Sequence, residues 1–214
     1  VLGIDIGGTN TVYGLVTRDG NVVYHESIPT NGSLPIADLL NRLNSKVNEA
    51  LSSYPGIKKI VGVGIGAPNG NHFTGMIQDP PNLSWGNVDV NTLFSKTFEC
   101  EVELTNDANA AAIGEKHFGI AKDMEDFVVI TLGTGLGSGI FCGGKLLYGY
   151  DGFAGEMGHI CIEVDGRICN CGNKGCLEAY ASAGGIKKTI KNLLLEYPDL
   201  SLIHISEPTR PLHI

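Results

Sequence analysis

Three cysteines lie within residues 169–176, and this cluster constrains the fold more than any other feature of the chain. Cys169, Cys171 and Cys176 enclose two glycines, which can adopt the backbone angles that a tight loop needs. Thiolates this close together suit tetrahedral zinc, and His159 is the obvious fourth ligand. Glu156 and Glu178 flank this ligand set, so a metal that fixes the loop would also fix two carboxylates able to hold hydroxyl groups.

A disulfide cluster is the main alternative to zinc. Cys169 and Cys171 are separated by one residue, which is a poor geometry for a mutual bridge. The sequence also shows no signal peptide or transmembrane run that would place the chain in an oxidising compartment. The pattern therefore favours zinc over a disulfide cluster or free thiols. Cys100, Cys142 and Cys161 lie in apolar or strand-like surroundings and are expected to be buried free thiols.

Composition narrows the class of protein. The 214 residues are 43% hydrophobic, which is enough for one substantial core or two small ones. A formal charge of -8, from 15 basic and 23 acidic residues without a Lys/Arg run, argues against nucleic acid or an anionic membrane as the main partner. We expect a soluble cytoplasmic protein that binds small molecules.

Apolar periodicity predicts an α/β layout. Alternating apolar runs and glycine turns predict a three-strand meander, and apolar residues at helical spacing then predict a helix that crosses back to a further strand. Strands are predicted over 1–6, 11–16, 22–24, 60–65 and 102–104, and helices over 35–51, 107–118 and 186–197. Asn106 or Asp107 is expected to cap the second helix. Strand, helix and strand in succession imply parallel pairing.

The second half of the chain begins in the same way as the first. Residues 128–135 can be laid over residues 1–9, because each segment is an apolar strand that runs into glycines. Such a repeat suggests two related domains, each with a glycine hairpin whose backbone N–H groups would meet phosphates in a cleft. We expect domains over 1–106 and 107–200. The alternative is that these are ordinary turn glycines without a ligand.

Six motifs occur together in a characteristic order. They are Asp5-Ile6-Gly7-Gly8-Thr9, Gly64-Ile65-Gly66-Ala67-Pro68, Pro81-Asn82-Leu83-Ser84-Trp85, Thr105-Asn106-Asp107-Ala108-Asn109-Ala110, residues 132–139 (LGTGLGSG) and the cysteine loop. In this combination the chain closely resembles the ROK family of sugar kinases and repressors. The resemblance implies an actin/hexokinase-like (ribonuclease H-like) fold with duplicated βββαβα domains around a cleft, the second of them incomplete here.

The resemblance also implies a reaction and the residues that carry it. The reaction is phosphorylation of the 6-hydroxyl of glucose or a related hexose by ATP with Mg²⁺, and Asp107 matches the catalytic base. The implied sugar contacts are Asn82, Asn106, Asp107, Glu156, His159 and Glu178. The implied ATP and magnesium contacts are Asp5, Gly7, Gly8, Thr9, Gly133, Thr134 and Gly135. A zinc ion held by His159, Cys169, Cys171 and Cys176 would be structural, because no coordination position stays open.

Other interpretations remain open. Asp107 can act as a helix cap alone. The chain can belong to a sugar-sensing repressor or to a sugar-binding module without catalysis. The few residues before Asp5 have no room for the helix-turn-helix domain of a repressor, but residues upstream of Val1 could have been lost. By this resemblance, we expect the family's C-terminal part to be absent from this sequence. We therefore expect a truncated chain with a non-native tail over 201–214, no measurable kinase activity on its own, and a homodimer in the full-length protein.

Overall fold

The computed structural model describes residues 1–81 and 83–198. The chain divides into two compact units. The first unit contains residues Val1–Thr131 and Gly137–Glu156, and the second contains Leu132–Leu136 and the chain from Met157 onward. No helix among the described residues is both long enough and apolar enough to cross a bilayer.

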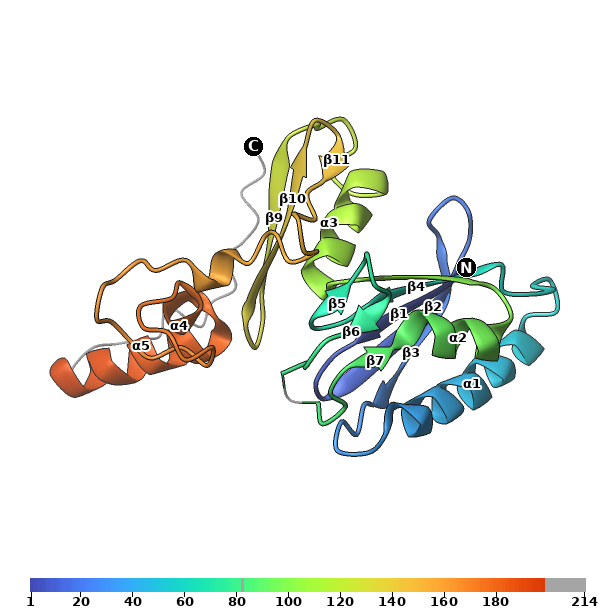
Figure 1. Cartoon of the computed structure of the whole chain (residues 1–214), viewed down its shortest axis with the longest axis horizontal. Helices are drawn as coiled ribbons and strands as arrows, with labels where there is room; N and C mark the ends of the chain where they lie inside the picture. The colour runs from blue at the N-terminus through green and yellow to red at the C-terminus, as the bar shows by residue number, and fades with distance from the viewer. Residues whose placement is uncertain (82, 199–214) are drawn as a thin grey trace. The chain divides into compact units, whose positions relative to one another are not determined.

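A five-stranded mixed sheet forms the centre of the first unit (Figure 1). Its strands are β1 (Leu2–Ile6), β2 (Asn10–Val16), β3 (Val22–Pro29), β4 (Gly62–Gly66) and β8 (Glu101–Thr105), in the order β3-β2-β1-β4-β8. The first three strands form an antiparallel meander, whereas β4 and β8 run parallel to β1. The predicted meander and parallel strands are thereby confirmed, with β3 longer than predicted.

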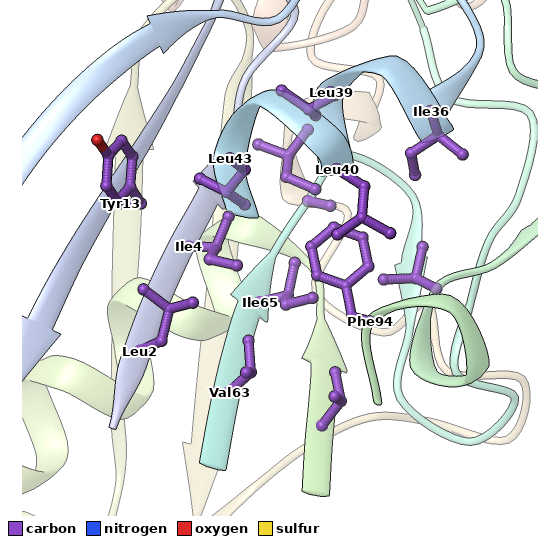
Figure 2. Close-up of a cluster of buried hydrophobic side chains, with 14 of the residues drawn as sticks. Leu2, Ile4, Tyr13, Ile36, Leu39, Leu40, Leu43, Val63, Ile65 and Phe94 are labelled. Carbon is purple, nitrogen blue, oxygen red and sulfur yellow. The ribbon is translucent and has the colours of Figure 1, made fainter. Parts of the chain in front are cut away.

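Helix α1 (Ile36–Ser53) covers this sheet through one apolar face. Its side chains at i, i+3, i+4 and i+7 pack on strand residues such as Ile4 and Ile65, as Figure 2 shows. Helix α2 (Val90–Phe98), which was not predicted, adds the fully buried Phe94 to the same core. A small sheet of β5 (Gly70–Asn71), β6 (Met76–Ile77) and β7 (Val88–Asp89) completes this part of the unit.

Helix α3 (Asp107–His117) packs closely against a second sheet of β9 (Phe127–Leu132), β10 (Leu136–Cys142) and β11 (Lys145–Leu146). A Cβ added to Gly139 would lie 2.5 Å from the Cβ of Ala112, and one added to Gly137 would lie 2.8 Å from the Cβ of Ala108. Glycines on the strand and alanines on the helix therefore permit this close approach. The predicted Ala-rich helix is confirmed.

The second unit contains little regular structure. It has a 3-10 turn at Met157–His159, a short helix α4 (Glu178–Ala181), and α5 (Ala183–Glu196), which confirms the predicted helix. Isolated bridges pair Cys161 with Cys176 and Ile168 with Lys174. The apolar stripe of α5 is exposed at Ile186 and Leu193. The predicted tail over 201–214 lies outside the described residues, and the predicted domain division stays a prediction.

Candidate functional site

The first group of candidate residues lies where three parallel strands end. Asp5 on β1 pairs with Gly66 on β4, and Gly66 pairs with Thr105 on β8, so the three residues form one row across the sheet. Helix α3 starts two residues after Thr105. The carboxyl ends of parallel strands are the usual location for ligands in α/β proteins. The fold therefore places Asp5 and Asp107 at a position suited to binding.

Asn106, and not Asp107, is the N-cap of α3. The Oδ1 atom of Asn106 accepts a hydrogen bond of 2.8 Å from the N–H of Ala108. Asp107 follows as the first residue of the helix, and its exposed carboxylate also accepts from the Ala108 N–H, at 2.9 Å. Capping is thus supplied by the neighbouring amide. The carboxylate of Asp107 keeps one oxygen and its solvent access for another role.

Asp5 and Asp107 face one another across Gly66. A Cβ added to Gly66 would lie 3.1 Å from the Cβ of Ala110, 3.5 Å from the Cα of Asp107 and 4.0 Å from Oδ1 of Asp5, which places this glycine between the two aspartates. Partial burial, followed by repulsion from the charge of Asp107, raises the pKa of Asp5. A divalent cation or a proton bound between the two carboxylates would reduce their mutual repulsion.

The raised pKa of Asp5 predicts that ionisation of this carboxylate destabilises the folded state as the pH rises. We expect Asp5→Asn to raise the free energy of unfolding at neutral pH, because the raised pKa means that the ionised form is disfavoured in the folded state. The gain should be absent below the ordinary pKa of 3.8, where Asp5 is protonated in both states, and should appear as the pH rises through the folded pKa. Urea unfolding from pH 3 to pH 7 measures it, with the exposed Asp123→Asn as a matched control. Equal curves for the two variants would show that folding does not raise the pKa of Asp5.

The turn between β1 and β2 carries the first glycine motif. The N–H of Gly7 donates to the carbonyl of Asn10 at 3.0 Å, and the carbonyl of Gly7 accepts from the Thr30 hydroxyl at 2.7 Å. A Cβ on Gly7 would meet the Asn10 carbonyl oxygen at 2.8 Å, so this position requires glycine. Within the described part of the chain, the N–H groups of Gly8 and Thr9 have no protein acceptor. These two donors are available to an anion.

The second group of candidate residues is the cysteine loop of the second unit. One donor atom from each of His159, Cys169, Cys171 and Cys176 lies within 4.8 Å of the others. The Sγ atoms of Cys171 and Cys176 are 3.7 Å apart, as are Sγ of Cys169 and Nδ1 of His159. Zn–S bonds of about 2.3 Å at tetrahedral angles put two sulfurs about 3.8 Å apart, whereas a disulfide needs about 2.05 Å. The donor set therefore fits zinc and does not fit a disulfide among these cysteines.

Backbone hydrogen bonds hold the loop in this shape. The N–H of Cys169 donates to the carbonyl of Asn173 at 2.8 Å, and the N–H of Gly172 donates to the carbonyl of Cys169 at 3.0 Å. Gly172 and Gly175 have φ of 90° and 74°, as the sequence predicts for the turns. Burial raises the pKa of Cys169 to about 12 and also raises that of Cys176, whereas the backbone N–H of Asn173 lowers that of Cys171. Metal binding would displace the protons that these thiols carry, against the burial that favours the protonated form of Cys169 and Cys176.

Glu178 ties the cysteine loop to the second glycine turn, which is Gly133–Gly135 between β9 and β10. Its Oε2 atom accepts a 2.9 Å hydrogen bond from the N–H of Leu136, and its Oε1 atom lies 3.6 Å from Sγ of Cys169. A Cβ on Gly135 would lie 2.6 Å from Oε2, so the carboxylate fills the space that this glycine leaves. The cysteine loop and the second glycine turn are therefore positioned together by one side chain.

Arg167 connects the cysteine loop to helices α4 and α5 through side-chain contacts. Its Nη1 atom donates to the carbonyl of Gly185 at 3.1 Å and to the Thr189 hydroxyl at 2.8 Å, and its guanidinium lies 4.5 Å from the centre of the Tyr180 ring. The Tyr180 hydroxyl accepts from the Arg167 N–H and donates to Glu163. Sequence reasoning missed this residue, since nothing in the motifs distinguishes Arg167 from a surface arginine.

Replacing Arg167 tests whether its contacts with α5 and Tyr180 stabilise the loop. We expect Arg167→Lys to destabilise the second unit by about 2 kcal/mol, because one ammonium cannot reproduce the planar fork that donates to α5 and stacks on Tyr180. Hydrogen exchange of the Gly175 amide, which donates to the Arg167 carbonyl, should accelerate accordingly. The exposed Arg18→Lys in the first unit is the matched control. Unchanged exchange at Gly175 would show that the contacts do not hold the loop.

The candidate residues therefore fall into two groups. The first group contains the first glycine turn with Asp5, Asn106 and Asp107. The second group contains the second glycine turn, Glu178 and the cysteine loop. Glu156 belongs to the first unit and His159 to the second. Asn82 lies outside the described residues.

The expectation for the remaining cysteines is partly wrong. Cys142 and Cys161 are exposed and Cys100 is half-buried. Cys142 lies at the end of β10, and Cys161 lies in a segment that makes only an isolated bridge.

Comparison with known proteins places these features in a family. Residues 1–210 match the ROK family, and this match extends into the segment expected to be a tail. The chain is 36% identical over 202 residues to a glucokinase of Thermotoga maritima, covering 92% of this chain and 62% of that protein. It is 35% identical over 196 residues to a xylose repressor of Caldicellulosiruptor bescii, covering 91% of this chain and 49% of the repressor.

A solved structure shows the same fold. A ROK family glucokinase from Streptomyces griseus, in complex with glucose and AMPPNP, aligns with a TM-score of 0.75 and 33% identity, over 92% of this chain and 62% of that one. The chain thus spans less than two thirds of the length of these relatives. The predicted hexokinase-like α/β fold, incomplete in its second domain, is confirmed by this match. From the motifs, the fold and the match over residues 1–210 together, we conclude that the chain belongs to the ROK family.

Proposed function

We propose that this chain is the principal part of an ATP-dependent hexose kinase that phosphorylates the 6-hydroxyl of glucose or a related hexose. The observation that carries the proposal is the exposed carboxylate of Asp107 at the start of α3, beside Asp5 at the end of β1. The likeness to the Thermotoga maritima glucokinase and to the Streptomyces griseus enzyme with glucose and AMPPNP supports a sugar kinase.

Asp107 would act as the general base. A hydroxyl within hydrogen-bond reach of its free oxygen would lose its proton to the carboxylate as it attacks the terminal phosphate of ATP. Because the transition state of phosphoryl transfer is loose, positioning and charge neutralisation contribute more than proton transfer does. Asn106 and Asn82 would orient the sugar, since an amide can both donate to and accept from hydroxyls. Oδ1 of Asn106 is engaged at the cap, which leaves its NH₂ group to donate.

Glu156, His159 and Glu178 would bind the remaining hydroxyls of the sugar. Nδ1 of His159 lies toward the cysteines, so a metal bound there would leave the proton on Nε2 as a donor to a hydroxyl. Zinc held by His159 and the three cysteines would shape the loop and supply no chemistry of its own. Glu178 would gain its orientation from this loop and from the Leu136 N–H.

The two glycine turns would bind the phosphates of ATP. The N–H groups of Gly8 and Thr9 are available for this role, and Gly7 allows the strand to turn at that point. Gly133, Thr134 and Gly135 would do the same in the second turn. Asp5 would hold a magnesium ion through water, and the positive charge would offset the burial and the repulsion from Asp107 that raise the pKa of Asp5.

A sugar-responsive transcriptional repressor is the second candidate, favoured by 35% identity to a xylose repressor. The same hydroxyl contacts would then report the presence of sugar without phosphorylation. Measuring ADP release with MgATP and a panel of glucose, mannose, N-acetylglucosamine, N-acetylmannosamine and xylose on the full-length gene product separates the candidates. Turnover with a hexose supports the kinase, and sugar binding without any ADP release supports the sensor.

A further inference from the structure

The second unit holds a fourth cysteine that the zinc group does not use. Cys161 lies two residues after His159, is exposed, and stands outside the set of four donors that the described residues bring together. It is paired across an isolated antiparallel bridge with Cys176, whose side chain is 1% exposed. An accessible thiol is therefore held opposite a buried thiol that belongs to the metal group.

The hydrogen bonds around this pair define its geometry. The N–H of Ile162 donates to the carbonyl of Gly175 at 2.8 Å, and the N–H of Leu177 donates to the carbonyl of Ile160 at 2.9 Å. These bonds join the neighbours of Cys161 and Cys176, which makes the cysteines a non-hydrogen-bonded pair. Such pairs have Cα atoms about 4.5 Å apart and their side chains on the same face. This separation lies within the range of about 4.4 to 6.8 Å that a disulfide spans.

The sulfur of Cys161 also lies close to the residue before Cys176. A Cβ added to Gly175 would be 3.1 Å from Sγ of Cys161 and closer still to the Glu163 carbonyl, so this position requires glycine and the thiol rests beside it. Cys171 is the competing partner for Cys176, because their Sγ atoms lie 3.7 Å apart, but Cys171 belongs to the donor set that would share the ion.

We propose that Cys161 is a resolving partner for Cys176, and that oxidation by a peroxide converts the pair into a disulfide that expels the metal from the loop. Cys161 reacts first because it is exposed and is not occupied by a ligand bond. Zinc would protect the three thiolates that it binds, so the unligated thiol is the entry point for the oxidant.

The two steps balance. In the first, the Cys161 thiol forms an S–O bond with hydrogen peroxide as the O–O bond breaks, giving a sulfenic acid and one water. In the second, the bond from Cys176 to the ion would break as the Cys176 thiolate attacks the sulfenic sulfur. The S–S bond forms, the S–O bond breaks, and the hydroxide that leaves takes up a proton from the solvent as the second water. Two thiol sulfurs are oxidised and the two peroxide oxygens are reduced. The ion is then left with three protein ligands and is released to water.

Loss of the metal would affect the proposed sugar contacts through Glu178. Glu178 is next to Leu177, whose N–H belongs to the same bridge, and Glu178 approaches Cys169 on the other side. If the proposed hexose site is correct, oxidation also weakens hexose binding. The thiol chemistry itself does not depend on that function, so it can be tested without an activity assay.

The test is zinc release from the zinc-loaded full chain on addition of hydrogen peroxide, followed with a chromogenic chelator, with non-reducing peptide mass spectrometry of the product. Wild type and Cys142→Ser, which removes another exposed thiol, should release one ion per chain and yield a Cys161–Cys176 linked peptide that dithiothreitol reverses. Cys161→Ser should load zinc normally and release it at least ~10-fold more slowly. Equal release from Cys161→Ser, a Cys171–Cys176 link in wild type, or only intermolecular links would overturn the proposal.

Discussion

In the full-length gene product, Asp107→Asn is expected to lower kcat for hexose phosphorylation by roughly 10² to 10⁴-fold, the range typical for loss of a positioned general base. The amide keeps the shape of the side chain and its contact with the Ala108 N–H is replaceable, because Asn106 already caps α3. It cannot accept the proton of the attacking hydroxyl. Sugar affinity should change little, so that the loss falls on kcat and not on KM.

The matched control is Asp123→Asn, an exposed aspartate in the same unit. It makes the same chemical change without touching the strand ends, and it should leave kcat within twofold or so of wild type. Thermal unfolding of both variants shows whether α3 is intact. An Asp107→Asn protein that turns over within about tenfold of wild type would show that Asp107 is not the base.

Cys171→Ser is expected to abolish stoichiometric zinc. Outer-shell substitutions at metal sites already cost about 10 to 100-fold in affinity, so removal of a ligand should cost at least ~100-fold. Wild type should carry one ion per chain, because four donors lie within 4.8 Å of one another. The loop should then loosen, and hexose affinity should fall because Glu178 loses its orientation. Elemental analysis and sugar titration measure the two effects.

Cys100→Ser provides the matched control for the zinc site. It makes the same change at a half-buried thiol in the first unit, far along the chain from the ligand set. Its zinc content should equal that of wild type. Wild-type protein that contains no zinc after purification without chelators, or Cys171→Ser protein that keeps one ion per chain, would contradict the assignment.

Elements with strong periodicity were predictable from the sequence because their apolar faces are long. Helix α1 repeats its buried positions over about four turns. The first hairpin has alternating strands joined by a turn at Gly7, where no side chain fits. Helix α2 was missed because it has only two buried positions, Val90 and Phe94, which is too few for a period. The strands β5, β6 and β7 have two residues each and show no alternation at all.

The chemistry of the candidate site was predictable in its residue types and less so in its contacts. The cysteine spacing indicated a metal loop, and the structure brings the predicted ligands together. The pairing of Asp5 with Asp107 depends on the register of β1, β4 and β8, which local sequence does not encode. Arg167 acquires its role from α5, many residues later. Cys161 looked like a buried strand residue because isoleucines flank it, yet Ile160 and Ile162 are themselves half exposed.

The most direct measurement of the central claim is the position of the phosphate on the product. The full-length gene product would be incubated with MgATP and either glucose or 6-deoxyglucose, and the products would be identified by ³¹P and ¹³C NMR. If Asp107 deprotonates the 6-hydroxyl, glucose yields the 6-phosphate, whereas 6-deoxyglucose binds competitively and yields no phosphorylated sugar. Phosphate on any other hydroxyl, or 6-deoxyglucose phosphorylated as readily as glucose, would contradict this account of the site.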